Sequence, residues 1–241
     1  ARLGSTRLPG KMLLRETGQS LIEHTHAAAV QAKRPDAVFV ATDHPAIAEE
    51  VRRFGGTPIM TRSDHASGGD RVAEVAERTP GFDFFVNLQG DEPEIDPAAI
   101  DQAIDRLAAD PEAQVATLAT PLRDPARVRD PANVKVVFDN SGRALYFSRS
   151  VIPHPRRWDE SLLAAEPPNF YQHLGVYAFR RQLLLQLSRL PAGRWEQLES
   201  LEQLRVLEQG RKIMIGVVPA ATRGIDTPAD YAAFVARRRA A

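Results

Sequence analysis

The chain has 241 residues, of which 43% are hydrophobic and 26% charged, an ordinary globular composition with enough length for one large domain. Its 31 basic and 31 acidic side chains balance, which argues against a generic nucleic-acid-binding protein, because such proteins normally carry an excess of positive charge. The sequence has no cysteine, which excludes disulfides and thiolate metal sites and fits a cytoplasmic location, and no apolar run approaches the roughly 20 residues of a membrane span.

Short apolar runs alternate with helical patterns along the chain. The runs with the length and composition of buried strands are residues 36–43, 82–91, 114–122 and 212–220. A helix predicted over 44–56 ends at two glycines, and another begins after Asp96, a suitable N-cap. This alternation predicts an α/β fold with a mostly parallel, Rossmann-like sheet flanked by helices.

The region that follows departs from this alternation. Residues 134–148 contain two apolar runs on either side of Asp139 to Gly142, which predicts an antiparallel β-hairpin. The proline-dense stretch 152–168 predicts a long loop. Because no repeat, low-complexity tract or linker interrupts the sequence, we expect a single domain over residues 1–241 with a hairpin-bearing excursion.

The first thirteen residues, ARLGSTRLPGKML, have the composition of an anion-binding loop. Gly4 and Gly10 allow backbone N–H groups to converge, and Arg2, Arg7 and Lys11 supply positive charge. The glycine spacing and the methionine after the lysine do not match a Walker A loop. A solvated basic segment has the same composition, so both interpretations stay open at this point.

Two acidic positions are candidate ligands for Mg²⁺. Asp91 follows the apolar part of a predicted strand, at the end where open α/β sheets bind ligands. Asp226 precedes a helix that Thr227 already caps, which leaves its carboxylate available. Two such carboxylates on separate strand ends could hold one Mg²⁺ beside substrate phosphates. A surface turn and an ordinary helix-entry acid are the alternatives.

Two segments carry candidate groups for nucleotide or sugar. Residues 63–71 combine glycines, hydroxyls and an arginine ahead of a helix, which suits either a nucleotide-contacting loop or a simple capped loop. A helix predicted over 195–210 places Glu202 inside its apolar face. A carboxylate there is either paired with Arg205 or, with neighbouring Gln203, lines a cavity for a hydroxyl-rich ligand.

The alternation of polar and apolar residues over 172–180 predicts a strand with one polar face. His173, Gly175 and Tyr177 share that face and alternate with apolar residues. Such a face can hydrogen-bond a ligand, although it is more commonly a solvated surface or a structural histidine.

Taken in order, these motifs resemble those of a known enzyme family. The segments that carry the resemblance are ARLGSTRLPGK, VATDHP, SDHASGGDR, VNLQGDEP, ALYFSRSVIP, HLGVYAF, LESLEQLRVLEQG and GIDTP. They are similar to those of the 3-deoxy-D-manno-octulosonate (Kdo) cytidylyltransferases, or CMP-Kdo synthetases. The resemblance implies a cytoplasmic, homodimeric nucleotidyltransferase that joins CTP to the acidic sugar Kdo with Mg²⁺, giving CMP-Kdo and pyrophosphate for lipopolysaccharide biosynthesis.

The same resemblance implies roles for individual residues. Those expected to bind the nucleotide are Arg2, Ser5, Arg7, Lys11, Ser67, Gly68, Arg71 and Gln89. Those expected to take part in catalysis are Lys11, Asp91 and Asp226, with the two aspartates as Mg²⁺ ligands. Those expected to face the sugar are Arg149, His173, Tyr177, Glu202 and Gln203. A small lobe within about residues 134–210 would serve sugar binding and dimerisation.

The sequence departs from the family pattern in two places. Family members carry an apolar strand immediately before the opening loop, and none precedes it here, so we expect the N-terminal strand to be missing from this chain. Gly69 stands where the family has a threonine, which removes a hydroxyl from the nucleotide loop. The alternative functions are a cytidylyltransferase for a related acidic sugar, such as an amino-substituted Kdo, and a catalytically inactive nucleotide- or sugar-binding regulator.

Overall fold

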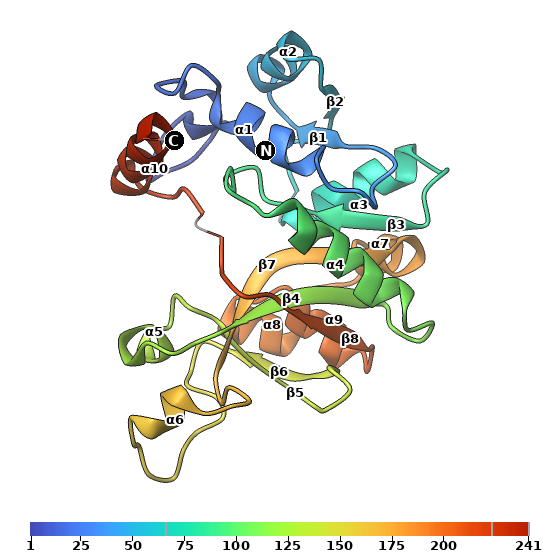
Figure 1. Ribbon diagram of the computed structural model, residues 1–241. Coiled ribbons are helices and arrows are strands. Elements are labelled where there is room, and N and C mark those ends of the chain that lie inside the picture. The colour runs from blue at the N-terminus through green and yellow to red at the C-terminus, as the bar shows by residue number, and fades with distance from the viewer. Residues whose placement is uncertain (66, 223, 241) are drawn as a thin grey trace. The chain divides into compact units, whose positions relative to one another are not determined.

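The computed structural model describes residues 1–65, 67–222 and 224–240, and the chain divides into two compact units (Figure 1). The first unit consists of Ala1–Gly81, Leu88–Asp101 and Thr222–Ala241. The second consists of Phe82–Asn87 and Gln102–Ala221, so it contains the whole 134–210 region. Within the described ranges, no helix is both long and apolar enough to cross a membrane.

The first unit contains a β–α–β element. β1 (Phe39–Thr42) pairs in parallel with β2 (Thr57–Met60), and α2 (Pro45–Arg53) connects them. The side chain of His44 caps α2 by accepting a backbone hydrogen bond of 3.2 Å. After the other end of the helix, Gly55 has φ +84°, a left-handed conformation that favours glycine. The predictions of a strand within residues 36–43 and of a helix over 44–56 that ends at glycine are confirmed.

Further helical segments of the first unit pack through two apolar clusters. The segments in these clusters are η1 (Lys11–Leu13), α1 (Leu21–Ala29) and α10 (Pro228–Ala240), and α3 (Gly68–Arg78) is a further helix of the same unit. One cluster buries η1, α1 and α2 against β1 through Met12, Ile22, Val40, Ile47 and Val51. The other joins α1 to α10 through Leu21, Ile225, Tyr231, Phe234 and Val235. Burial of these side chains is the main force that holds the unit together.

Two predicted helix starts are confirmed by their hydrogen bonds. Asp96 Oδ1 accepts from Ala98 N at 2.9 Å and so caps α4 (Pro97–Ala108). At the start of α10, Asp230 N donates to Thr227 Oγ1 at 3.1 Å, and Thr227 N donates to Asp230 Oδ2 at 2.8 Å. This reciprocal pair is a capping box, and it leaves the side chain of the preceding aspartate free of the capping role.

The second unit is built on a six-stranded sheet in the order β6-β5-β7-β4-β8, with β3 also paired to β7. Its strands are β3 (Phe84–Asn87), β4 (Val115–Pro121), β5 (Lys135–Phe138), β6 (Ala144–Ser148), β7 (Tyr171–Arg180) and β8 (Ile213–Val217). β3, β4 and β5 pair antiparallel to β7, and β8 pairs parallel to β4, so these four strands share one direction. The α/β class with a mostly parallel sheet and flanking helices is confirmed, while β6 and β7 run the opposite way.

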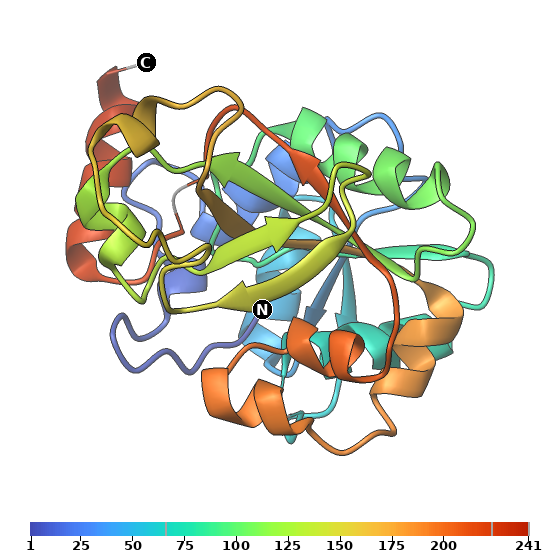
Figure 2. The ribbon, with the colours of Figure 1, turned by 90° about the horizontal axis from the view of Figure 1, so that it is seen from below.

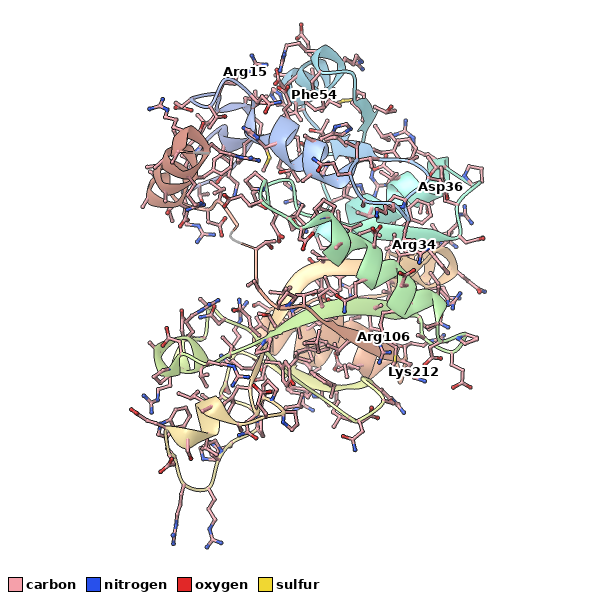
Figure 3. The ribbon with its side chains drawn as sticks, viewed as in Figure 1. Arg15, Arg34, Asp36, Phe54, Arg106 and Lys212 are labelled. Carbon is pink, nitrogen blue, oxygen red and sulfur yellow. The ribbon has the colours of Figure 1, made fainter. Side chains whose placement is uncertain are left out.

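The predicted hairpin is confirmed as the antiparallel pair β5–β6 (Figure 2). Asp139 Oδ1 holds its turn by accepting hydrogen bonds from the N and Oγ of Ser141, at 2.9 and 2.6 Å. Gly142 takes φ +84° in the same turn. Arg106, on α4, donates to the carbonyls of Ser141 and Ile215 and so links the turn to β8 (Figure 3).

The segment expected to be one long helix forms two short ones. α8 (Arg194–Glu199) and α9 (Gln203–Glu208) are separated at Ser200, whose φ of +53° is left-handed and ends α8. The prediction of a single helix was therefore wrong, and Trp195 and Leu198, expected on its buried face, are 41% and 79% exposed. Other helices of this unit are α5 (Pro125–Arg129), α6 (Ser161–Ala164), which lies inside the expected long loop, and α7 (Arg181–Leu187).

Candidate active site

Lys11 is the centre of a polar cluster in the first unit. The opening loop turns at Gly10, whose φ of +67° is readily adopted by glycine, and η1 begins at the next residue. The Nζ of Lys11 donates to Asp91 Oδ2 at 2.5 Å, to Asp226 Oδ1 at 3.0 Å and to the Ile225 carbonyl at 2.7 Å. The whole residue is 7% exposed. Two carboxylates that are remote in the sequence therefore converge on one ammonium group.

Backbone pairing brings the two aspartates together. Ile225 N donates to the Asp91 carbonyl at 2.8 Å, which joins the two segments immediately beside their carboxylates. Arg7 Nη2 lies 3.1 Å from Asp226 Oδ2 while Lys11 contacts Oδ1, so both oxygens of Asp226 face cations. The Arg7 side chain is 64% exposed, and water screens its pair with Asp226.

The protonation of Lys11 follows from its neighbours. Burial lowers the pKa of Lys11, but hydrogen bonds and attraction to Asp91 and Asp226 outweigh burial, and the pKa is raised overall. The side chain is therefore charged at neutral pH. The cluster therefore contains one permanently charged ammonium group, that of Lys11, in contact with the carboxylates of Asp91 and Asp226.

The two aspartates fit a divalent metal by the chemistry of their donor atoms. Mg²⁺ prefers oxygen ligands and is usually held by one or two carboxylates together with substrate phosphates. One oxygen from each of Asp91 and Asp226 lies within 3.0 Å of the same cationic nitrogen, so both already face a common positive charge. Among the residues that the structure describes, no group of three or more His, Cys, Asp or Glu side chains could hold a metal. A metal at this pair would therefore depend on substrate oxygens to complete its coordination.

The other candidates of the opening loop make local contacts. Arg2 is exposed, and its Nη2 donates to the His65 carbonyl at 2.8 Å, which connects the loop to the segment before α3. Ser5 Oγ accepts from Leu8 N at 3.3 Å and so stabilises the loop itself. Both side chains belong to the same unit as Lys11.

The remaining nucleotide candidates surround the start of α3 and the turn before Asp91. Ser67 caps α3, and Gly68 is the first residue of that helix. Gln89 is exposed, and its carbonyl accepts from Glu92 N at 3.3 Å. Ala66, inside the motif 63–71, lies outside the described residues. Their roles toward a nucleotide stay a prediction.

Arg71 is 4% exposed, and its guanidinium is bound inside the protein. Nη2 donates to Asp43 Oδ2 at 2.8 Å, and Nη1 donates to the hydroxyl of Thr61 and to the carbonyl of Arg62. Asp43 and Thr61 directly follow β1 and β2, so Arg71 ties α3 to the ends of both strands. Sequence reasoning missed Asp43, although its position at the end of a predicted strand is the same pattern that selected Asp91.

In the second unit, Arg149 is tied to the junction between α8 and α9. Nε donates to the Glu199 carbonyl at 2.7 Å, Nη2 to the Ser200 carbonyl at 3.3 Å and Nη1 to the Pro131 carbonyl at 3.2 Å. The Glu199 carboxylate accepts from Arg149 N at 2.8 Å and from Ser148 Oγ at 2.7 Å. These bonds fix both the backbone and the guanidinium of Arg149.

Lys135 supports the same segment and was missed from the sequence. The residue is fully buried, and its Nζ donates to the carbonyls of Asp130 at 3.0 Å, Asn133 at 2.6 Å and Arg149 at 2.5 Å. Burial, the largest effect, lowers its pKa. A lysine at the start of an apolar strand is the pattern that could have drawn attention to it.

Three sugar-facing candidates meet beside β7. Tyr177 OH donates to Gln203 Oε1 at 3.0 Å, and the His173 ring lies 5.3 Å from that of Tyr177 and 4.9 Å from that of Phe147. His173 is 8% exposed, and burial lowers its pKa to about 3. Gln203 is 4% exposed, and its Nε2 has no hydrogen-bond partner among the described residues. A buried amide without a partner is costly, so this Nε2 group remains available to donate to an oxygen atom.

Glu202 is exposed, so the expectation that it lies inside a buried apolar face was wrong. The physical reason is the break at Ser200, which makes Glu202 the residue before α9. Burial and the charge of Glu202 raise the pKa of Tyr177, so the carboxylate lies near the phenol. Arg205 forms a two-point ion pair with Glu196, at 2.6 Å for both contacts.

Comparison with known proteins identifies the family. The family model for cytidylyltransferases matches residues 1–213. The chain belongs to the cytidylyltransferase family. This cytidylyltransferase is 48% identical over 238 residues to a 3-deoxy-manno-octulosonate cytidylyltransferase of Rhodopirellula baltica, covering 98% of the chain and 95% of the relative. It is 42% identical over 240 residues to an 8-amino-3,8-dideoxy-manno-octulosonate cytidylyltransferase of Shewanella halifaxensis, covering 98% and 95%.

The cytidylyltransferase also resembles a solved structure. That structure is CMP:2-keto-3-deoxy-manno-octonic acid synthetase complexed with CTP, with a TM-score of 0.92 and 42% identity. The match covers 100% of this chain and 96% of the other. The resemblance found in the motifs is thereby confirmed, and the chain is a nucleotidyltransferase.

Proposed function

We propose that this cytidylyltransferase transfers the cytidylyl group of CTP to Kdo, with Mg²⁺, giving CMP-Kdo and pyrophosphate for lipopolysaccharide biosynthesis. The convergence of Lys11, Asp91 and Asp226 on one point carries the proposal. Relatives at 42–48% identity that are named for Kdo and its 8-amino form support it, as does the similar structure complexed with CTP. The anomeric hydroxyl of the sugar loses its proton and attacks the α-phosphorus, the bond from that phosphorus to the oxygen that bridges it to the β-phosphate breaks, and pyrophosphate leaves with that oxygen.

The first unit would bind the triphosphate and neutralise its charge. Transfers of this kind depend mainly on positioning and electrostatic stabilisation. Lys11 and Arg7 would supply positive charge to the phosphates, and Arg2 would add a further cation at the edge of the same loop. Asp91 and Asp226 would hold Mg²⁺, which when bound supplies positive charge that polarises phosphoryl oxygens.

The second unit would bind the sugar. Arg149 offers positive charge that complements the sugar carboxylate, and Glu202 offers acceptor oxygens for sugar hydroxyls. Tyr177, His173 and Gln203 add hydrogen-bonding groups in largely apolar surroundings. We further propose that the enzyme is a homodimer, which light scattering on the purified chain would measure.

A second candidate substrate is an 8-amino-substituted Kdo, because a relative at 42% identity is named for that sugar. The deciding assay incubates the purified chain with CTP, Mg²⁺ and either sugar and measures pyrophosphate release. Faster release with Kdo supports the proposed substrate. Release with only the amino sugar would make the second candidate correct, and release with neither sugar from a folded chain would refute the proposed function.

A matched pair of variants connects this assay to the site. Asp226→Asn removes one carboxylate charge from the cluster at Lys11, whereas Asp36→Asn removes an exposed charge elsewhere in the first unit (Figure 3). We expect the first change to abolish most pyrophosphate release and the second to leave it unchanged. Equal activity in the two variants would show that the cluster is not where the transfer occurs.

A further inference from the structure

Thr117, on β4, makes three polar contacts at an irregularity in the sheet. The register between β4 and β7 shifts directly after Thr117, which exposes carbonyl groups of β7 to its side chain. Its Oγ1 lies 2.8 Å from the Val176 carbonyl oxygen, 3.1 Å from that of Leu174 and 3.0 Å from His173 Nε2. Thr117 is fully buried, so these three contacts must be satisfied within the protein.

The single hydroxyl proton of Thr117 limits which ring nitrogen of His173 can carry a proton. A threonine hydroxyl has one proton to donate, and a carbonyl oxygen can only accept. If the hydroxyl donated to His173 Nε2, two carbonyl oxygens would lie within 3.1 Å of Oγ1 with no proton between them. If the hydroxyl donates to a carbonyl, Nε2 carries a proton and donates it to Oγ1. The second arrangement makes one more hydrogen bond in a buried site and is therefore favoured.

The neutral imidazole ring of His173 carries one N–H proton, on either Nδ1 or Nε2. Burial lowers the pKa of His173 to about 3, so the ring is neutral near pH 7. Its nearest ring neighbours are Phe147 and Tyr177, which offer no negative charge that would stabilise an imidazolium. In a neutral ring with a proton on Nε2, Nδ1 is an acceptor.

We propose that Thr117 is a positioning residue that holds His173 as the neutral Nε2–H tautomer, so that Nδ1 presents a lone pair to a hydroxyl group of the sugar. The identity of the ligand rests on the proposed function, whereas the tautomer does not. An acceptor at Nδ1 selects a group that carries a proton, such as a hydroxyl, and disfavours a carboxylate. Gln203, which accepts from Tyr177, offers the opposite polarity through its Nε2, a donor with no partner in the part of the chain that the structure describes.

The tautomer is measured directly by NMR of the full chain labelled with nitrogen-15 histidine, without substrate, at about pH 7. Protonated and unprotonated ring nitrogens have well-separated chemical shifts, and a His173→Asn variant assigns the signals. We expect Nε2 of His173 to be protonated and Nδ1 unprotonated. A proton on Nδ1, alone or together with one on Nε2, would overturn the proposal.

Variants of Thr117 test its positioning role. Thr117→Val keeps the shape and removes the hydroxyl, so we expect His173 to populate both tautomers and the KM for Kdo to rise about tenfold, with the KM for CTP unchanged. Thr117→Ser restores the hydroxyl and should restore both readouts. Thr120→Val, a buried threonine on the same strand, is the matched control and should behave like the parent chain.

Each outcome of these measurements is decisive. A Thr117→Val chain with an unchanged tautomer or an unchanged KM for Kdo would overturn the proposal, as would an equal rise in KM for both substrates. If Thr117→Val does not fold, the parent and Thr117→Ser spectra decide. An Nε2–H tautomer in a chain that transfers nothing to Kdo would refute the proposed function and leave the tautomer assignment standing.

Discussion

Acidification should weaken the second unit through His173. Burial lowers the pKa of this side chain from 6.5 to about 3. As the pH falls below 6.5, the unfolded chain takes up a proton on His173, whereas the folded chain keeps the ring neutral until about pH 3. Because the unfolded state binds more protons across this window, the contribution to stability is complete above pH 6.5 and is lost as the pH falls through the window.

The size of the effect follows from the two pKa values. Each pH unit well inside the window removes about 1.4 kcal/mol. Between about pH 8 and about pH 5, the free energy of unfolding should therefore fall by about 2 kcal/mol through His173 alone. The whole window down to the folded pKa of about 3 corresponds to about 5 kcal/mol.

Urea unfolding followed by tryptophan fluorescence measures this change in the relevant unit, because Trp158 and Trp195 both belong to the second unit. The comparison is between the parent chain and His173→Gln, at about pH 8 and about pH 5. Glutamine does not titrate, so the variant should lose about 2 kcal/mol less than the parent on acidification, and the subtraction removes the contribution of other groups. Equal losses in the two chains would refute the reasoning.

Three further changes test other parts of the structure. Asp91→Ala should reduce pyrophosphate release by several orders of magnitude while the circular dichroism spectrum stays unchanged, and near-normal release would remove Asp91 from the mechanism. Lys135→Met leaves three carbonyls without the donor that now serves them and should lower the free energy of unfolding by about 2 to 4 kcal/mol, measured in urea. The exposed Lys33→Met should cause little change, and equal midpoints for these two variants would show that the carbonyls find other partners. Glu202→Gln should raise the KM for the sugar more than the KM for CTP in steady-state assays, and the reverse order would assign Glu202 to the nucleotide.

The sequence predicted those parts of the fold that local chemistry decides. Buried strands were recognised from the length of apolar runs, and the starts of α4 and α10 from capping residues at Asp96 and Thr227. The antiparallel placement of β7 among β3, β4 and β5 had no local signature, because strand pairing depends on contacts between distant segments. The break between α8 and α9 was missed because serine is an unusual residue for the left-handed turn at Ser200.

The sequence predicted those site residues whose reactive side chains lie at the end of a strand or the start of a helix. Asp91 and Asp226 were selected in that way, and the structure brings their carboxylates to one point, but the position of Lys11 between them follows only from the folded chain. Thr117 and Lys135 were missed for a different reason. Each acts through backbone carbonyls that a strand register or a loop brings close, and a sequence pattern does not report carbonyl positions.

The ammonium group of Lys11 bears on how the first unit assembles. Two negative side chains drawn together from distant segments repel each other, and the repulsion is stronger where water is excluded. The ammonium group of Lys11, which follows the opening loop, lies between the two carboxylates and offsets that repulsion. The polypeptide can therefore gather its acidic pair during folding without help from nucleotide or metal, and substrates would encounter the two carboxylates already side by side.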